Sequence, residues 1–374
     1  MTHRGFRMME RQGFAADCAE IVTAERKGWG RRDILRAAAA LGIAPAAAGF
    51  GRSARAAVPE VVVCNWGGEA TRAFTDAFVT PYQAATGGKM VLDGSGPSNG
   101  KVRAMVEAQH VIWDLCDSGV AGIGELGPLG LLTPIDYTVV DKTRLLTDFA
   151  YEFGVVNYMF STVMAWDTKI VTQPPTLADF FDLKKYPGKR MMRKDNQAMV
   201  EMALMADGVA PDKLYPLDTK RAFAKISTIK SELLFWDTGA QSQNLLRDGE
   251  VTMGWLWHTR ATLLKRDTKG QIDWSFKGGL LQPGLWTVPK GNPAGKQAMV
   301  AIAAMQAPAG QISLLGAMGN GPANPQAEPL VPPALKAVDP GTPENLAVQA
   351  KINAPWYQAN GSATLRDYLD LISS

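Results

Sequence analysis

Cysteine and histidine are scarce in this chain of 374 residues, which contains three of each. Beyond residue 56 only Cys64, Cys116, His110 and His258 remain. Two cysteines form one bridge at most, so the fold cannot rest on a disulfide scaffold. The spacing of these four residues matches no zinc motif, and no phosphate-binding P-loop is present. We therefore expect neither a metal nor a cofactor.

Positive charge is not in excess over most of the chain, although the whole sequence has a formal net charge of +3. Residues 1–56 hold ten basic and five acidic side chains, which leaves −2 for the remaining 318 residues. A nearly neutral chain lacks the basic surface that attracts nucleic acids or anionic membranes. We expect neither as a partner.

The basic excess lies ahead of a short apolar stretch. Arg31 and Arg32 precede the alanine-rich run 37–50, and Ala54-Arg55-Ala56 offers a small-x-small cleavage site. The run is shorter than the roughly 20 residues that span a bilayer. A basic segment, a short apolar run and such a site are the parts of an export signal, and the paired arginines resemble a twin-arginine signal. We expect residues 1–56 to be an export signal cleaved near Ala56, which leaves a periplasmic protein; an amphipathic N-terminal helix is the alternative.

Strand-like and helix-like segments alternate along the rest of the chain, in two blocks separated by Gln173-Pro174-Pro175. In the first block, strands are expected at 60–64, 89–92 and 111–116, with helices at 69–86 and 101–110. In the second, strands are expected at 190–193, 233–236, 251–256 and 286–289, with helices at 176–182, 198–206, 219–229, 240–246, 295–306, 310–318, 344–352 and 359–372. This alternation predicts an α/β fold with parallel sheets, whose ligands lie at the carboxyl ends of the strands.

One motif points to an enzyme. Gly96-Pro97-Ser98-Asn99-Gly100 matches G-x-S-x-G between a strand and a helix, and His258 is the only histidine far enough downstream to complete a triad. The loop 94–100 is too long for a sharp elbow, however, and Pro97 fixes φ just before the serine. We favour a polar loop in which Ser98 and free backbone N–H groups face a ligand. A secreted α/β serine hydrolase using Ser98 and His258 is the alternative.

Tryptophan is the unusual residue, with ten in the chain. Trp66 and Trp257 follow strand ends, so we interpret both as walls of a pocket whose indole faces attract a cation. Trp255 and Trp286 are expected in the core. Cys64 and Cys116 each end an apolar run and are expected to be buried free thiols, with a bridge between neighbouring strands as the alternative. The match of 122–127 to G-x-G-x-x-G is interpreted as accidental, because no strand directly precedes it.

Seven segments carry a resemblance to a known family. They are VCNWGG (63–68), WDLCDSG (113–119), LLTPID (131–136), TLADFFDLKKYPG (176–188), GAQSQNLLRDGEVTMGWLWHTR (239–260), WTVPKG (286–291) and GNGPANP (319–325). Together they resemble the extracellular solute-binding proteins of ABC importers, in the spermidine/putrescine-binding group.

The resemblance implies a two-lobed periplasmic-binding-protein fold of type II, in which each lobe is a mostly parallel sheet flanked by helices. Residues 57–160 and 285–330 would form lobe 1, residues 161–284 lobe 2, and 331–374 a C-terminal helical segment that packs across the lobes. The implied function is to capture a small polar solute by hinge closure and to deliver it to an ABC permease. The protein would act as a monomer and not as an enzyme.

The resemblance also implies a site. Trp66, Ser118, Asp195 and Trp257 fall where polyamine binders place an aromatic wall, a hydroxyl, an amine-pairing carboxylate and a second aromatic wall, and Trp356 matches a late site tryptophan. Other positions depart from the pattern: Val120, Ala198, Gly284 and Gln282 replace an aromatic residue, two carboxylates and a tryptophan. A second ammonium group therefore has no assigned acid, and a polyamine, a monoamine, a zwitterion or another small polar solute all remain open. The candidate ligand-binding residues are Asn65, Trp66, Gly67, Ser98, Asp117, Ser118, Asp195, Trp257, Gln282 and Trp356.

Overall fold

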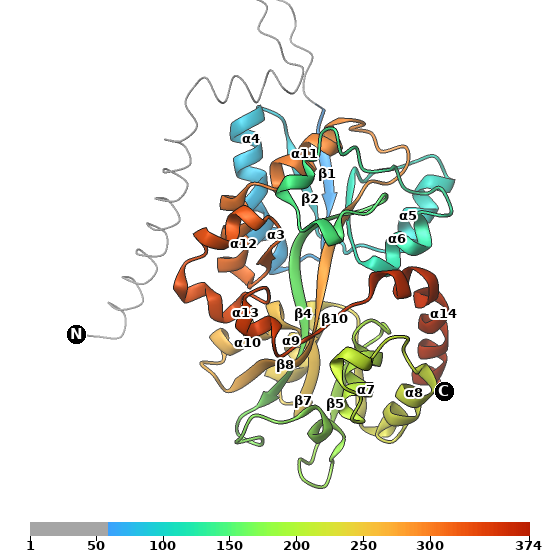
Figure 1. The fold of residues 1–374 in the computed structure, drawn as a ribbon, viewed down its shortest axis with the longest axis vertical. Helices are drawn as coiled ribbons and strands as arrows, with labels where there is room; N and C mark the ends of the chain where they lie inside the picture. The colour runs from blue at the N-terminus through green and yellow to red at the C-terminus, as the bar shows by residue number, and fades with distance from the viewer. Residues whose placement is uncertain (1–58) are drawn as a thin grey trace, which may run out of the picture. The chain divides into compact units, whose positions relative to one another are not determined.

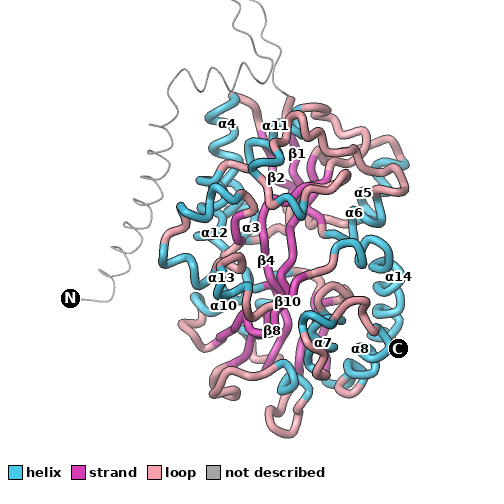
Figure 2. The backbone as a smooth tube through the Cα atoms, viewed as in Figure 1, coloured by secondary structure: helices cyan, strands magenta, loops and turns pink. Residues whose placement is uncertain are grey.

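One mixed β-sheet of ten strands runs the length of the protein in a computed structural model that describes residues 59–374 (Figure 1). The expected export signal and its cleavage site near Ala56 lie outside the described residues. Figure 2 shows the strands along the centre and the helices on either side of them. The main strand order is β2-β1-β3-β8-β4-β7-β5-β6.

Three parallel strands make up one end of the sheet, and we call this part lobe 1. They are β1 (Val61–Cys64), β2 (Met90–Asp93) and β3 (Leu115–Ser118). The flanking helices are α3 (Glu69–Phe74), α4 (Thr80–Thr86), α5 (Asn99–Glu107), α6 (Val120–Leu126), α11 (Gln297–Met305) and α12 (Pro308–Met318). A π-helical turn, Thr75–Val79, joins α3 to α4, so the helix expected at 69–86 is confirmed as one continuous helical segment.

Three more parallel strands make up the opposite end, lobe 2. They are β5 (Arg190–Arg193), β6 (Leu233–Trp236) and β7 (Met253–Trp257). Their helices are α7 (Met199–Ala206), α8 (Thr219–Ser227), α9 (Gly239–Arg247) and α10 (His258–Asp267). The expected strands at 190–193 and 233–236 match β5 and β6 residue for residue.

Two long antiparallel strands, β4 (Val155–Asp167) and β8 (Ile272–Thr287), pass through both lobes. Their pairing extends from Val155 opposite Trp286 to Asp167 opposite Ile272. The expected α/β, two-lobed fold is confirmed, with parallel pairing among the three outer strands of each lobe. The lobe boundaries expected at 160/161 and 284/285 fall inside β4 and β8. Part of each of these two strands therefore belongs to lobe 1 and part to lobe 2.

The C-terminal segment contains α13 (Pro343–Leu346), β10 (Ala350–Lys351) and α14 (Ala354–Ser373). The helix expected at 344–352 is wrong beyond Leu346, because the chain there forms β10 and pairs in parallel with β8. Burial of Ala350 and Ile352 stabilises this pairing. The long helix α14 contacts α6 of lobe 1 and α8 of lobe 2 (Figure 1).

Three other expected elements differ locally. The strand expected at 286–289 is only the end of β8, which begins at Ile272 and ends at Thr287. The strand expected at 111–116 is β3 and starts at Leu115, because the Asp114 carboxylate accepts hydrogen bonds from the backbone N–H groups of Val62, at 2.7 Å, and Ala294, at 2.6 Å. The helix expected at 176–182 is a short 3₁₀ turn, Leu177–Phe181, closed by a capping box between Thr176 and Asp179.

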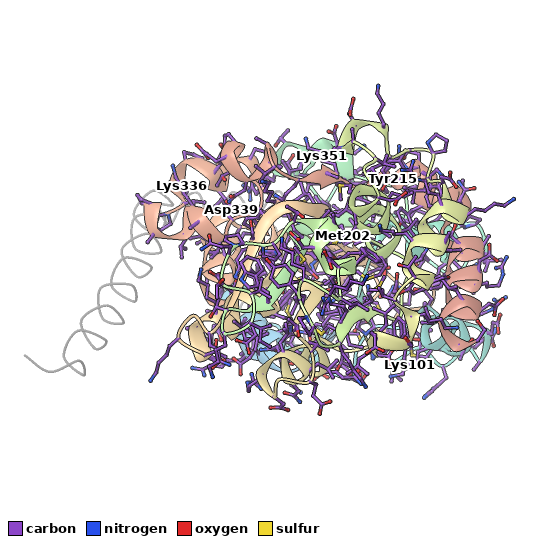
Figure 3. All side chains as sticks on the ribbon, turned by 90° about the horizontal axis from the view of Figure 1, so that it is seen from below. Lys101, Met202, Tyr215, Lys336, Asp339 and Lys351 are labelled. Atoms are coloured by element: carbon purple, nitrogen blue, oxygen red, sulfur yellow. The ribbon has the colours of Figure 1, made fainter. Side chains whose placement is uncertain are left out.

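The buried hydrophobic residues form one large cluster and two smaller ones among residues 59–374. Trp255 and Trp286 are fully buried, as expected, and Met202 lies inside the molecule while Lys101, Lys336 and Lys351 lie at its edge (Figure 3). Cys64 and Cys116 are register partners in β1 and β3 and are buried free thiols. Within residues 59–374 no single helix has the length and hydropathy to cross a membrane; the bent pair α11 and α12 meets those two criteria together, and much of it is buried core.

Candidate functional site

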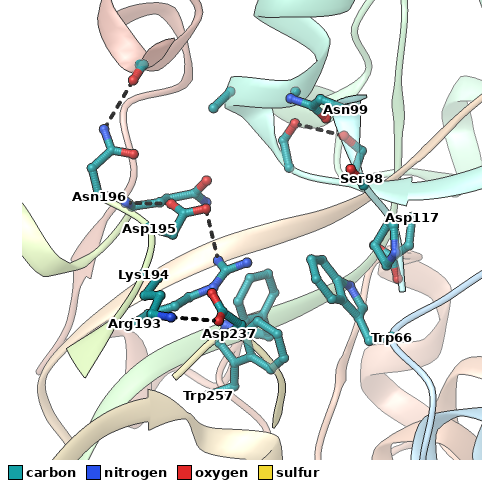
Figure 4. A pocket seen from close by; sticks show the side chains of 18 of the residues that line it. Trp66, Ser98, Asn99, Asp117, Arg193, Lys194, Asp195, Asn196, Asp237 and Trp257 are labelled. Atoms are coloured by element: carbon teal, nitrogen blue, oxygen red, sulfur yellow. Dashed lines mark hydrogen bonds and ion pairs between the residues drawn. The ribbon is translucent and has the colours of Figure 1, made fainter. Parts of the chain in front are cut away.

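A cavity of about 580 Å³ lies between the lobes. Its volume is in the range of small-molecule sites. Six of the expected site residues line it: Trp66, Ser98, Asp117 and Ser118 from lobe 1, and Asp195 and Trp257 from lobe 2 (Figure 4). Gly361, Ser362 and Leu365 of α14 add a further wall. The carboxyl ends of β1, β3, β5 and β7 therefore meet at one cavity, as the strand-end rule predicts.

The other four expected residues do not line the cavity. Asn65 is buried and its Oδ1 accepts a hydrogen bond from the backbone N–H of Gly67 at 3.0 Å. Gly67 has a φ of +67°, and a Cβ there would overlap the carbonyl oxygen of Gly94. Buried Gln282 donates to Thr162 Oγ1 at 2.8 Å, and Trp356 packs on Tyr215 and Tyr357. Two of the four contact the lining: Gln282 Oε1 accepts a hydrogen bond from Gln197, and the Gly67 carbonyl oxygen accepts one from Arg260.

Asp117 is a buried carboxylate without a cationic partner. Its Oδ2 accepts a hydrogen bond from the Tyr158 hydroxyl at 2.7 Å, whereas its Oδ1 has no hydrogen-bond partner among the described residues. Burial raises the pKa of Asp117 to about 7, and hydrogen bonds from Tyr158 and Trp66 lower it by less. A carboxylate in this state favours an incoming cation.

Arg260 is a buried guanidinium that forms no ion pair with a carboxylate among the described residues. The residue is 3% exposed, and its Nη2 donates only a long hydrogen bond, 3.5 Å, to the carbonyl oxygen of Gly67. Its Nε has no hydrogen-bond partner within residues 59–374. Burial lowers the pKa of Arg260 from its usual value, but an arginine stays charged at neutral pH. Arg260 lines the cavity and so brings a positive charge to it, while its Nε packs against Gly239 of α9.

Asp195 already has a cationic partner. Its Oδ2 lies 3.5 Å from Nη1 of Arg193, and its Oδ1 accepts a hydrogen bond from the backbone N–H of Gln197 at 2.9 Å (Figure 4). The Arg193 guanidinium in turn lies over the rings of Trp66 and Trp257. The carboxylate that was expected to pair with an amine thus pairs with an arginine of the same lobe.

The lobes touch each other across the cavity. The rings of Trp66 and Trp257 meet edge to face with centroids 5.1 Å apart, and Arg260 of lobe 2 bonds to Gly67 of lobe 1. The structure is therefore in a closed arrangement, in which residues of both lobes contact the same small volume.

Sequence reasoning missed Tyr158, Arg193 and Arg260. Arg193 ends β5, so the rule that ligands lie at the carboxyl ends of strands marks it as clearly as it marks Asp195. Arg260 lies in the first turn of α10, three residues after Trp257, and carries the same signal. Tyr158 lies inside β4, where sequence position alone gives no such signal.

The histidine of the supposed triad is fully engaged elsewhere. His258 Nδ1 accepts from the backbone N–H of Ser161 at 2.9 Å, and Nε2 bonds to the carbonyl oxygen of Gly319 at 2.7 Å. Burial lowers the pKa of His258 to about 4. Ser98 lies at the N-terminus of α5, where its Oγ accepts from the backbone N–H of Lys101 at 3.4 Å. His258 has no free nitrogen with which to activate Ser98, which removes the physical basis of the hydrolase alternative.

Comparison with known proteins gives consistent matches. A family model described as a bacterial extracellular solute-binding protein matches residues 77–341. The chain is 31% identical over 320 residues, 83% of its length and 90% of the relative's, to a gamma-aminobutyric acid-binding protein of Pseudomonas aeruginosa. The solved Atu4243-GABA receptor is 31% identical with a TM-score of 0.76, and the match covers 84% of this chain and 98% of that one. The binding protein AgtB of A. tumefaciens R10, solved with agropinic acid, is 31% identical with a TM-score of 0.79, and the match covers 84% and 99%.

A spermidine/putrescine binding protein of Streptococcus pneumoniae shares the fold, with 15% identity, a TM-score of 0.64, and 84% and 99% of the two chains covered. At this identity the likeness concerns the fold alone. None of these relatives is named as a hydrolase.

Proposed function

The chain belongs to the bacterial extracellular solute-binding protein family, and on that premise we propose that its solute is a small amino acid with separated ammonium and carboxylate groups, such as γ-aminobutyrate. It is a substrate-binding component of an ABC transporter, which captures a small ligand between its lobes for delivery to a permease. One observation supports this choice of solute: the cavity contains a buried carboxylate and a buried guanidinium that both lack a partner of opposite charge.

Each unpaired ion corresponds to one end of such a ligand. Burying a charge without a counter-charge is costly, so the ligand ammonium group is drawn to Asp117 and the ligand carboxylate to Arg260. Arg193, which pairs with Asp195, also lines the cavity and is a second positive group there. The names of the relatives agree with this ligand class, since two of them are named for γ-aminobutyrate.

The same pairing accounts for hinge closure. Asp117 lies in β3 of lobe 1, one residue before its end, and Arg260 lies on α10 in lobe 2, so a zwitterion bound to both connects the lobes. A ligand shifts the equilibrium toward the closed state only through contacts that the open state lacks. A ligand with one charged group engages one lobe strongly and gains little from closure.

A diamine fits these charges poorly. A second ammonium group on the side of Arg193 and Arg260 would be repelled by like charges, and it would find an acid only by reaching Glu125, which lines the cavity and accepts a hydrogen bond from Asn99. A polyamine is therefore a less favoured solute than an amino acid such as γ-aminobutyrate.

The test is calorimetric titration with three solutes that share a four-carbon backbone: γ-aminobutyrate, putrescine and succinate. We expect γ-aminobutyrate to bind at least tenfold more tightly than either, because only it matches both unpaired charges. If putrescine or succinate binds as tightly as γ-aminobutyrate, the proposed solute class is wrong.

We further propose that residues 1–56 export the protein through a twin-arginine route and that cleavage near Ala56 releases a periplasmic monomer without catalytic activity or nucleic-acid partner. Mass spectrometry of the exported protein should find an N-terminus at Ala57. Replacing Arg31 and Arg32 by lysine should block export by the twin-arginine route, whereas continued export would indicate the general secretory route.

A further inference from the structure

Three indoles surround a cation that belongs to the protein itself; those of Trp66 and Trp257 line the cavity, and that of Trp236 is fully buried. The guanidinium carbon of Arg193 lies 5.0 Å from the ring centre of Trp257, 5.5 Å from that of Trp66 and 5.8 Å from that of Trp236. All three distances fall within the range of cation–π attraction, about 6 Å. Such an arrangement of rings is the kind of cage that binds amine and quaternary ammonium ligands, but here a side chain occupies it.

The rings and the acid of this cage come from both lobes. Trp66 follows β1 in lobe 1, whereas Trp236 and Trp257 end β6 and β7 in lobe 2. Trp236 and Trp257 also meet edge to face, with centroids 5.1 Å apart, and Asp195 closes another side of the guanidinium at 3.5 Å. The cage therefore has aromatic faces and a carboxylate, the features by which the sequence resembles polyamine binders.

The backbone holds Arg193 in place. Its carbonyl oxygen accepts a hydrogen bond from the Tyr368 hydroxyl of α14 at 2.8 Å, and its N–H faces the Met199 sulfur at 3.3 Å. The side chain is 17% exposed, so the guanidinium presents only a narrow edge to the cavity. A tethered cation of this kind is present at a high effective concentration at all times.

We propose that Arg193 is a specificity-determining residue that fills the aromatic cage from within and thereby excludes amine solutes from it. The inference rests on the proposed function in assuming that this cavity is the solute site. A free amine that entered the cage would have to displace the tethered guanidinium or lie beside it, and two cations at such separations repel each other. A solute carboxylate, in contrast, is attracted to the exposed edge of the same guanidinium.

Removal of the side chain should turn the cage into a cation site. In Arg193→Ala, three indoles and the Asp195 carboxylate would face an empty volume. We expect this variant to bind tetramethylammonium and ethylguanidinium at least tenfold more tightly than the natural protein, measured by calorimetry and by tryptophan fluorescence. Arg193→Lys keeps a cation and should show no gain. Arg221→Ala removes an arginine that pairs with Asp207 on the surface of lobe 2, and should show none either.

Arg193→Gln is a second variant that removes the charge but keeps a long polar side chain, and thermal unfolding reports whether each variant is folded. The inference is overturned if the folded neutral variants gain no affinity for either cation. The natural protein is titrated with γ-aminobutyrate in the same experiment. A gain of cation binding in the variants without γ-aminobutyrate binding in the natural protein would contradict the proposed solute and leave the role of Arg193 standing.

Discussion

Asp117 and Arg260 are buried groups whose hydrogen-bond partners are neutral, a phenol for the acid and a carbonyl oxygen for the base, although the charge of Glu69 raises the pKa of Arg260 against the larger effect of burial. Such ions are costly in the closed arrangement when no solute is bound, because burial removes the water that would solvate them. Their cost is offset only when a solute supplies the missing counter-charges. The two unpaired charges therefore strengthen solute binding, and they lower the free energy of unfolding when no solute is bound.

Replacing Arg260 by methionine should separate the two effects. We expect Arg260→Met to raise the free energy of unfolding of the empty protein by about 1–3 kcal/mol, because an unpaired buried charge is removed at similar volume. The same variant should lose γ-aminobutyrate binding. Urea denaturation and calorimetry measure both quantities. Arg266→Met, an exposed position on the same helix, serves as the control and should change neither; a destabilised Arg260→Met with unchanged affinity would contradict the prediction.

Solute affinity should fall as the medium becomes acidic. The pKa of Asp117 is raised to about 7 in the empty protein, and the protonated carboxyl group cannot pair with an ammonium ion. From pH 7 to pH 5.5 the affinity for γ-aminobutyrate should therefore drop by up to tenfold per pH unit. Calorimetry across this range tests it. Asp117→Asn should bind weakly at every pH, and a pH dependence that persists in that variant would assign the titration to another group.

The rule that ligands lie at the carboxyl ends of strands predicted which residues line the cavity, but not which charged partners those residues have. Trp66, Asp117 and Trp257 follow or end strands and line the cavity, and Arg193 satisfied the same rule unnoticed. The pairing of Asp195 could not be predicted, because it depends on the direction in which Arg193 turns after β5. Two tryptophans and Asp195 taken alone suggest a site for a cationic group of the solute. Because the Arg193 guanidinium lies between them, this part of the cavity instead attracts an anionic group.

At the scale of elements, α14 packs closely on α6 through glycine. A Cβ at Gly124 of α6 would overlap the backbone of Gln358, and one at Gly361 of α14 would approach Ala121 at 3.3 Å. On the lobe 2 side, α14 is held by hydrogen bonds instead, from Asn196 to the Gly361 carbonyl oxygen and from Tyr368 to that of Arg193. Because residues of α14 also line the cavity, this helix couples the lobes at the site.

Adding one methyl group at this contact should therefore oppose closure. We expect Gly124→Ala to weaken γ-aminobutyrate binding severalfold and to lower the free energy of unfolding by about 1–3 kcal/mol, as overpacking does. Ala363→Val places extra volume on an exposed position of α14 and should leave the affinity unchanged. If Gly124→Ala binds as tightly as the natural protein, α14 does not need this close approach to α6.

Short elements were easier to predict than the long shared strands. The strands at 190–193 and 233–236 are bounded by turn residues and local patterning, which sequence reasoning uses directly. The strand β8 includes glycines, a lysine and a proline between residues 277 and 284, so it shows no period-two pattern. Its pairing with β4 joins Thr162 to Leu280, across more than a hundred residues, and no local signal specifies such a partner.

The whole molecule should respond to pH in the opposite sense from its affinity. Buried Glu201 accepts hydrogen bonds from the Tyr215 and Tyr357 hydroxyls at 2.6 and 3.0 Å, and burial raises the pKa of Glu201 to about 7, as it does that of Asp117. These acids take up protons in the folded state before they do so in the unfolded state. Stability from both is therefore gained as pH falls below about 7.

His258 works against this gain. Its folded pKa of about 4 lies below the unfolded value of 6.5, so its contribution is full above pH 6.5 and is lost as pH falls toward 4. Two acids outweigh one histidine, and we expect the empty protein to gain about 1–2 kcal/mol of unfolding free energy between pH 8 and pH 6. Urea denaturation at the two pH values tests this. A combined Asp117→Asn and Glu201→Gln variant should lose the gain, and its persistence there would point to other groups.

The passage of β4 and β8 through both lobes has a consequence for how the protein unfolds. Loss of either lobe would strip one end of each long strand of its hydrogen-bonded neighbours and expose an unprotected sheet edge. Neither half is then a separate folding unit, although the solute sits between them. The described part of the chain should melt in one cooperative calorimetric transition, with the calorimetric enthalpy equal to the van 't Hoff enthalpy.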